Sequence, residues 1–206
     1  MAYRKTEFVE NKQKATRERI VRTARALVEL GGWKNCSLNA VAAEAGVSVG
    51  SVYTHFGKIT DLYIDVFEAI AGEEVAILAK IVASSGSASE RFLRAVDTFA
   101  RRALRGRIKA YAVIAEPVAA EVDNVRQKAH AWFIDEFEKI IACGVETGEF
   151  RPQNPRISAA CVLGLLAETL VIPLSPDAAP LADSGAQLRA EILDFCRRAV
   201  GVSSIA

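Results

Sequence analysis

The segment Ser37-Leu-Asn-Ala-Val-Ala-Ala-Glu-Ala-Gly46-Val-Ser48-Val-Gly-Ser-Val-Tyr-Thr-His-Phe56-Gly57-Lys58 contains the signals for two short helices joined by a tight turn. Ser37 and Ser48 are of a type that caps helix N-termini, and apolar residues follow each of them at helical spacing. Gly46 and Gly57 suit the two helix ends, because glycine readily adopts the left-handed conformation found there. This arrangement predicts a helix-turn-helix, whose second helix can enter the major groove of DNA.

The second of these helices has an inward and an outward face. Val49, Val52 and Phe56 fall at i, i+3 and i+7, which predicts that they point inward. Small or hydroxylated side chains on the outward face would let a groove floor approach closely, and longer polar side chains beside them could reach phosphates. The outward residues are Gly50, Ser51, Tyr53, Thr54 and His55.

This segment resembles the DNA-binding domain of the TetR (tetracycline repressor-like) family of bacterial transcriptional regulators. The likeness extends from about residue 16 to about residue 67 and is carried by Val41-Ala42, Ala45-Gly46-Val47-Ser48, Gly50-Ser51-Val52-Tyr53, His55-Phe56 and Lys58. The resemblance implies phosphate contacts for Ser37, Tyr53, His55 and Lys58, and base-edge contacts near Val49, Gly50, Ser51 and Thr54. The expected DNA-binding residues are therefore Ser37, Ser48, Val49, Gly50, Ser51, Tyr53, Thr54, His55 and Lys58. Val49 stays open, because its spacing also points it inward.

Composition fits a globular chain. Of the 206 residues, 51% are hydrophobic and 25% are charged. No apolar run reaches the ~18 residues of a membrane span, and residues 1–13 lack the apolar core of a signal peptide. We therefore expect a cytoplasmic protein that does not enter a membrane.

The charges are distributed unevenly along the chain. Residues 1–60 carry ten Lys and Arg against five Asp and Glu, whereas residues 61–206 carry sixteen against twenty. A basic N-terminal quarter fits one module that faces DNA. Ordinary solvated surface charge remains an alternative.

Four cysteines occur singly, with no Cys-x-x-Cys pair. We interpret Cys36, Cys143, Cys161 and Cys196 as reduced and largely buried thiols, with a redox sensor as the alternative.

Helical periodicity continues on both sides of the central segment. Thr16 is expected to cap a first helix that ends at Gly31-Gly32, after a mobile tail over residues 1–14 that either contacts DNA or aids solubility. A long helix over residues 58–83 follows, and then four or five more helices. No run alternates with the period of a strand. The predicted fold is all-α, with an N-terminal arm and three-helix helix-turn-helix DNA-binding domain (residues 1–57) joined by the long helix to a C-terminal helical ligand-binding and dimerisation domain (residues 58–206).

The helix predicted over residues 156–172 is apolar almost all round, so it must be covered on two sides. Small residues such as Ala160 and Gly164 would let a partner approach. We expect a homodimer through helices 156–172 and 186–200, in agreement with the resemblance. A central helix buried within a monomer is the alternative.

Aromatic residues in the second domain could line a cavity for an apolar or aromatic small-molecule effector: Phe92, Phe99, Tyr111, Trp132, Phe133 and Phe137. The polar candidates beside them are Glu116, His130, Glu168 and Thr169. Aromatic residues at helical spacing are also typical of an ordinary core, so both interpretations stand.

The resulting hypothesis is a ligand-responsive DNA-binding transcriptional regulator, a repressor, that binds a palindromic operator in double-stranded DNA as a homodimer. The alternative is a helical DNA-binding protein regulated by protein partners. No cluster has metal-ligand spacing, and no catalytic or phosphate-binding motif is present. We therefore expect no enzyme activity, no cofactor and no metal.

Overall fold

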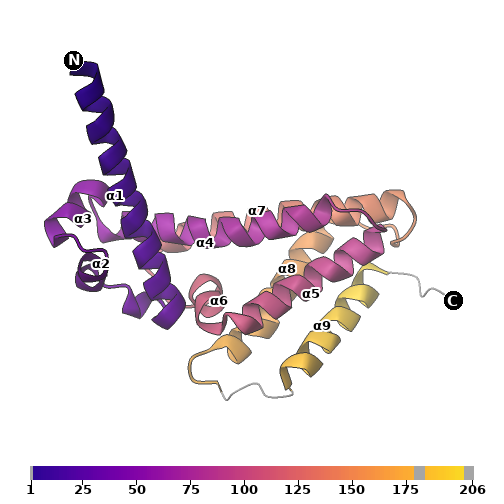
Figure 1. Ribbon diagram of the computed structural model, residues 1–206. Helices are drawn as coiled ribbons and strands as arrows, with labels where there is room; N and C mark the ends of the chain where they lie inside the picture. Colours follow the sequence, from indigo (N-terminus) through magenta and orange to yellow (C-terminus); the bar gives the residue numbers. More distant parts are fainter. Residues whose placement is uncertain (1, 179–183, 202–206) are drawn as a thin grey trace.

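The chain is helical throughout the part that the structure, a computed structural model, describes: residues 2–178 and 184–201 (Figure 1). Those two ranges contain nine α-helices, one short 3₁₀ helix and no strand, so the predicted all-α fold is confirmed. The α-helices are α1 (Ala2–Gly31), α2 (Leu38–Glu44), α3 (Val49–Phe56), α4 (Ile59–Val82), α5 (Ala88–Arg105), α6 (Arg107–Ile114), α7 (Ala120–Glu146), α8 (Pro155–Leu174) and α9 (Ser184–Val200). The 3₁₀ helix is η1 (Trp33–Asn35).

Helix α1 begins much earlier than the sequence pattern predicted. It starts at Ala2, and the Thr16 hydroxyl donates to the Lys12 carbonyl oxygen at 3.0 Å inside the helix instead of capping its start. The mobile tail predicted over residues 1–14 is therefore wrong. These residues lack apolar periodicity, but they contain no glycine or proline that would stop a helix. The extra turns project away from the rest of the molecule (Figure 1).

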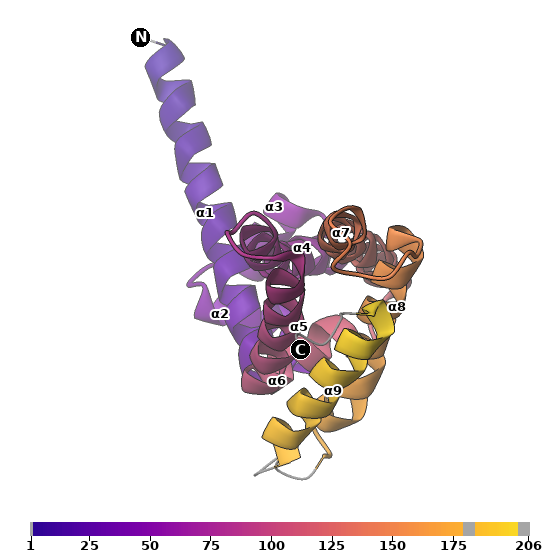
Figure 2. The same ribbon diagram turned by 90° about the vertical axis from the view of Figure 1, so that its right-hand side faces the viewer.

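The molecule has an N-terminal unit, α1 to α3, and a body formed by α4 to α9. Helices α4 and α7 are the longest elements of the body and pack side by side as they lead away from the N-terminal unit (Figure 1). Helix α5 packs on α4, α7, α8 and α9. Seen from the end, α8 and α9 lie along one side of the body, and α1 projects on the other (Figure 2).

Two apolar cores hold these helices. The N-terminal core contains Ile20, Val52, Phe56 and Phe67, but also Ala112 of α6 and residues of the first half of α7, such as Val125. The second core lies in the body, among α4, α5, α7, α8 and α9. Apolar packing therefore crosses residue 57, where we placed the domain division, and that division stays a prediction.

Helix α8 corrects the expectation that no apolar segment of the chain is as long as a membrane span. It is long and apolar enough to cross a membrane by length and composition, although a helix inside a folded protein passes the same test. Only 33% of its most apolar window is buried in the protomer, and Ile157 and Ile172 are 62% and 78% exposed. Within the described residues, α8 thus presents an uncovered apolar face.

The cysteines differ in exposure. Cys36 and Cys196 are buried, Cys143 is half-buried and Cys161 is exposed on α8. Burial raises the pKa of the Cys36 thiol to about 12 and that of Cys196 to about 11. These two thiols are therefore protonated at neutral pH and poorly reactive.

Candidate functional site

The ends of the two helices of the helix-turn-helix are fixed by local interactions with neighbouring residues. The Ser37 hydroxyl accepts a hydrogen bond from the Ala40 amide at 3.2 Å, and the Ser48 hydroxyl accepts one from the Ser51 amide at 3.1 Å. Gly46 and Gly57 adopt positive φ angles of 63° and 67° where the two helices end. Each helix therefore starts and stops where its own residues dictate.

Helix α3 has one buried and one open face. Val52 and Phe56 are 1% and 5% exposed, whereas Tyr53 is 49% exposed. Gly50 and Thr54 lie on the open side, and a side chain at position 50 would meet only the Ser48 hydroxyl, at 3.8 Å. The Thr54 hydroxyl donates to the Gly50 carbonyl oxygen at 2.9 Å, so its hydrogen is already used within the helix. A partner can thus approach this part of α3 closely.

The other expected DNA-binding residues surround that face. Ser37, Ser48 and Lys58 are exposed, and Ser51 and His55 are half-buried. Val49 is half-buried against the N-terminal core. Its position at the edge of α3 agrees with the inward spacing of the sequence and still leaves part of its side chain accessible. The DNA-binding role of all nine residues stays a prediction.

Helix α1 is fixed against α3 and α4. The Arg17 guanidinium lies over the Phe56 ring, 4.7 Å from its centroid, and pairs with Asp65 at 2.5 Å. One side chain of α1 therefore contacts both the buried end of α3 and the first turns of α4.

A second contact connects the N-terminal unit to the α6–α7 turn. The Glu116 carboxylate accepts hydrogen bonds from the backbone amides of Trp33, at 2.9 Å, and Lys34, at 3.4 Å. The Trp33 indole donates to the Ala112 carbonyl oxygen at 2.9 Å. Gly32 has a φ of 75°, and a side chain there would lie 2.5 Å from the Glu116 carboxylate. We call these interactions the Trp33–Glu116 contact.

The body contains a partly open, apolar cavity of about 70 Å³ between α4, α5, α6, α7 and α8. Its lining residues are Phe67, Ile70, Ala71, Glu74, Phe99, Arg102, Ala103, Lys109, Ala110, Val113, Ile114, Arg126, Ala129, His130, Phe133, Leu163 and Ala167.

Three of the predicted ligand-binding residues line this cavity: Phe99, His130 and Phe133. The Phe99 and Phe133 rings meet edge to face, with their centroids 5.6 Å apart.

The other predicted residues lie elsewhere. The fully buried Phe92 and Phe137 pack together in the body core, and Trp132 packs against the N-terminal core. Tyr111 packs against the body core without lining the cavity. Glu116 belongs to the Trp33–Glu116 contact, Glu168 is exposed on α8, and the Thr169 hydroxyl donates to the Leu165 carbonyl oxygen at 2.7 Å.

One side of the cavity is charged, which we did not expect from the sequence. The Glu74 carboxylate accepts hydrogen bonds from the Arg102 guanidinium, at 2.6 and 2.9 Å, and from the Lys109 ammonium, at 3.2 Å. Burial favours the protonated form of Glu74, but these two cations outweigh it and lower the pKa of its carboxyl group. The group is thus an ionised carboxylate shared by two cations. The acidic pair Glu73-Glu74 in the sequence could have suggested this charged side of the cavity. The cations that bind Glu74, however, come from two other helices.

This charged side continues to the N-terminal unit. Arg102 also lies 3.6 Å from the Glu73 carboxylate, and Glu73 pairs with Arg25 of α1. We call the series Arg25–Glu73–Arg102–Glu74–Lys109 the ion-pair chain. It runs without interruption from α1, next to the helix-turn-helix, to the lining of the cavity.

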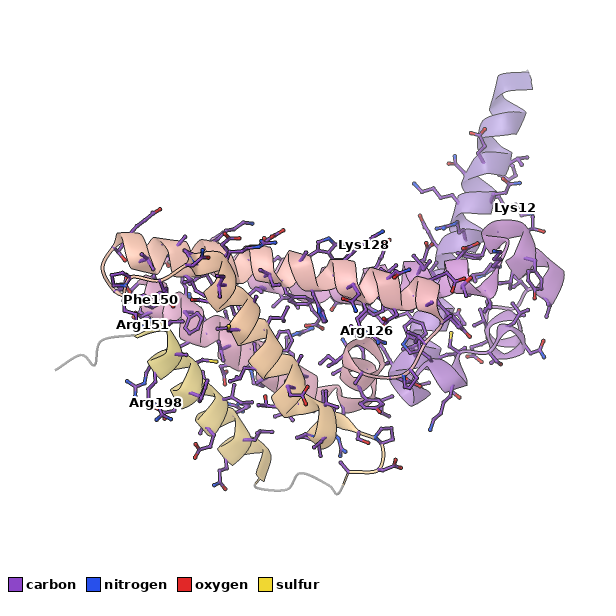
Figure 3. All side chains as sticks on the ribbon, turned by 180° about the vertical axis from the view of Figure 1, so that it is seen from behind. Lys12, Arg126, Lys128, Phe150, Arg151 and Arg198 are labelled. Carbon is purple, nitrogen blue, oxygen red and sulfur yellow. The ribbon has the colours of Figure 1, made fainter. Side chains whose placement is uncertain are left out.

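Arg126 also lines the cavity and points from α7 toward α6, whereas Lys128 points to solvent (Figure 3). The Arg126 guanidinium donates to the backbone oxygens of Val113, at 3.0 Å, and Glu116, at 2.7 Å. The neighbouring His130 is exposed on α7, but desolvation of its ring lowers its pKa, and the positive charge of Arg126 lowers it further. His130 is therefore neutral at pH 7 and offers the cavity an uncharged polar ring.

The described residues contain no cluster of three or more metal-ligating side chains.

Comparison with known proteins identifies the N-terminal unit. Residues 20–66 match the family model of bacterial regulatory proteins, tetR family. This range covers the end of α1, both helices of the helix-turn-helix and the start of α4. No curated protein sequence is significantly similar to the chain.

Solved structures share the whole fold. A transcriptional regulator of the TetR/AcrR family from Thermobifida fusca is 23% identical, with a TM-score of 0.67, over 86% of this chain and 96% of that one. FadR from Bacillus subtilis, in complex with stearoyl-CoA, is 16% identical, with a TM-score of 0.71, over 92% and 99% of the two chains. RolR, in complex with resorcinol, is 20% identical, with a TM-score of 0.63, over 94% and 91%. Residues 20–66 therefore carry the DNA-binding domain that the tetR family model describes, and the chain has the fold of a solved TetR/AcrR-family regulator.

Proposed function

We propose that this transcriptional regulator is a homodimeric repressor that binds a palindromic operator in the cytoplasm and leaves it when a small molecule enters the body. The observation that carries the proposal is the open face of α3, formed by small and hydroxylated residues between the Ser48 cap and Gly57. Phosphate-reaching side chains at its edges, Tyr53 and Lys58, would fix its orientation in a major groove.

Base recognition by such a face relies on few side-chain donors. Gly50 has no side chain, and the Thr54 hydroxyl hydrogen is engaged within α3. We infer that α3 reads DNA through methyl contacts, through water and through DNA shape. One helix of eight residues spans only a few base pairs, so specificity requires a second copy.

The uncovered face of α8 supports that second copy. The exposed residues of α8 are Arg156, Ile157, Ala160, Cys161, Gly164, Glu168 and Ile172. Positions 157, 160, 164, 168 and 172 follow one another at intervals of three or four, so they form one stripe, with Arg156 and Cys161 beside it. Phe195 of α9 adds an apolar side chain that is 54% exposed. The same stripe on a two-fold related protomer would cover this surface.

The cavity and the ion-pair chain support a response to an effector. FadR and RolR have been solved with stearoyl-CoA and resorcinol, respectively. In this chain the cavity shares Glu74, Arg102 and Lys109 with a series of ion pairs that reaches α1. A molecule that changes those pairs would change the position of α1 and α4 relative to the body, provided that it binds the two arrangements with different affinity.

The small cavity also favours the second candidate, a regulator controlled by a protein partner. At about 70 Å³ the cavity is about half the ~150 Å³ of an engineered cavity that accepts benzene. Saturable binding of a small molecule that releases the operator would exclude this candidate.

The proposal is tested by binding of the purified protein to its upstream intergenic DNA across a salt series, with measured stoichiometry. We expect two protomers per palindromic site and a steep salt slope. Lys58→Ala should weaken binding similarly on all sequences and reduce the slope by about one unit, whereas Thr54→Ala should change the preference between operators. Lys80→Ala, an exposed residue of α4 far from α3, is the matched control. Weak binding that is equal on every DNA would contradict the proposal.

A further inference from the structure

An open hollow on the surface lies directly outside the cavity. It measures about 470 Å³ and is formed by Ile77 of α4, the C-terminal half of α5, the turn at Gly106 and the start of α6. Four cationic side chains line it: Arg101, Arg102, Arg105 and Lys109. Among the residues that the structure describes, no carboxylate lines this hollow.

The hollow and the cavity have two lining residues in common. Arg102 and Lys109 border both, whereas Glu74 borders only the cavity. The hydrogen bonds that join Glu74 to Arg102 and Lys109 therefore form the partition between an apolar interior and a basic exterior.

The cations of the hollow are incompletely neutralised. Glu74 shares its one negative charge between Arg102 and Lys109, and the Glu73 carboxylate, which also pairs with Arg25, lies 3.6 Å from Arg102. Arg101 reaches the Asp97 carboxylate only at 3.7 Å. Arg105 forms no ion pair with any residue that the structure describes. An anion placed here would meet several donors at once, in the geometry that favours carboxylates and phosphates.

The interior offers the opposite chemistry. Phe67, Phe99, Phe133 and Leu163 supply an apolar lining, and the guanidinium of Arg126, which also lines the cavity, is bound to the Val113 and Glu116 backbone oxygens. At about 70 Å³ this space admits an apolar group only if its wall moves. The partition is held by exchangeable hydrogen bonds, so a second anion can take the place of Glu74 on Arg102 and Lys109.

We propose that the effector is an anionic amphiphile, with an apolar body that enters the cavity and a carboxylate or phosphate head group that binds Arg101, Arg102, Arg105 and Lys109 in the hollow. This inference rests on the proposed effector response and names the chemical class of the molecule. Its head group replaces Glu74 as the partner of Arg102 and Lys109, and the ion-pair chain then loses its connection at Glu74.

The test compares probes that differ only in the head group. Isothermal titration calorimetry measures the dissociation constants of octanoate, octyl phosphate and octan-1-ol, and of 4-phenylbutanoate and 4-phenylbutan-1-ol. Inorganic phosphate alone tests whether the hollow is a simple ion site. We expect an anionic member to bind about tenfold or more tightly than its matched alcohol, since hydrogen bonds between charged groups strengthen binding by that order. The two octyl anions distinguish a carboxylate from a phosphate head group.

Two substitutions test whether the preference for the anion depends on the cations of the hollow. Arg105→Gln removes one cation of the hollow without disturbing an ion pair of the described residues, and it should abolish most of the preference for the anion. Arg94→Gln, on the same helix but outside the hollow, should leave the preference unchanged.

Equal affinity for anion and alcohol, binding of inorganic phosphate alone with the same affinity, or no binding of any probe would each overturn the inference. Operator binding without any probe is measured on the same samples. Retained operator binding would then leave the DNA-binding part of the proposed function intact. Loss of operator binding together with a clear preference for the anion would instead overturn the proposed function and support the binding site.

Discussion

The N-terminal unit and the cavity region are held together by different kinds of interaction. In the N-terminal unit, the hydroxyls of Ser37 and Ser48 cap the two helices, and Phe56 is buried behind α3. Around the cavity, three helices meet at a carboxylate shared by two cations, next to space that side chains do not fill. Caps and close packing fix one arrangement, whereas ion pairs at an incompletely filled space can change partners. The comparison favours a rigid part for the proposed contact with DNA and an adjustable part for the proposed response to a ligand.

The largest expected effect concerns α8, because the proposed dimer forms through its exposed stripe. Ile172→Glu places a charge on the exposed apolar stripe and should produce monomers without unfolding the protomer. Operator affinity should fall by about 10²–10⁴-fold, because the second half-site no longer gains from the first. Light scattering and operator titration measure both changes. Leu30→Glu, at a site that is 71% exposed on α1, should leave the mass unchanged. A monomeric variant that retains full affinity would contradict the dimer.

The second prediction compares the two apolar cores. Phe56→Ala and Phe92→Ala each remove a buried ring, so each should lower the free energy of unfolding by about 3–5 kcal/mol. We expect one cooperative transition in urea for both variants, because α4 and α7 contribute to both cores. Phe8→Ala, where the ring is 70% exposed, is the control and should have little effect. Two separate transitions would show that the N-terminal unit unfolds independently.

The Trp33–Glu116 contact supports a smaller effect. Glu116→Gln leaves only one carbonyl oxygen for the two backbone amides, so the free energy of unfolding should fall by about 1–2 kcal/mol. Denaturation in urea measures it, with the exposed Glu121→Gln as a control. If this contact also transmits the effector signal, the variant should need more effector to release the operator. An unchanged effector response would confine Glu116 to a structural role.

The smallest expected effect depends on pH. Because the pKa of Glu74 is lower in the folded protein than its ordinary value of 4.5, the ionised group stabilises the fold above that value. This contribution is lost as the pH falls through the lower, folded pKa. Wild-type protein should therefore lose its stability advantage over Glu74→Gln below about pH 4.5. Thermal melts of both proteins between pH 3 and pH 7 provide the measurement, and a constant difference would argue against the shared ion pair.

Local signals made the helix-turn-helix predictable from sequence. The caps, the glycines and the inward spacing of Val52 and Phe56 lie within 22 consecutive residues, and each acts on its immediate neighbours. The long helix α4 was equally predictable, because its apolar stripe runs without a break. The start of α1 was not, since Thr16 has the residue type of a cap but lies inside a longer helix.

The cavity was harder to predict from the sequence, because its lining residues come from five helices. Spacing alone could not distinguish Phe99 and Phe133, which line the cavity, from Phe92 and Phe137, which fill the core. Glu116 was expected to face a ligand, and only the tertiary structure shows that it binds backbone amides 82 and 83 positions away along the chain.

The contact between Gly32 and Glu116 also constrains which sequences this fold can accept. Any side chain at position 32 would adopt an unfavourable positive φ and collide with the Glu116 carboxylate. A larger residue at position 32 therefore displaces the Glu116 carboxylate, and the Trp33 amide then needs another acceptor. Among proteins that share this arrangement, the two positions should change together, so a survey of natural variants can detect the contact without a structure.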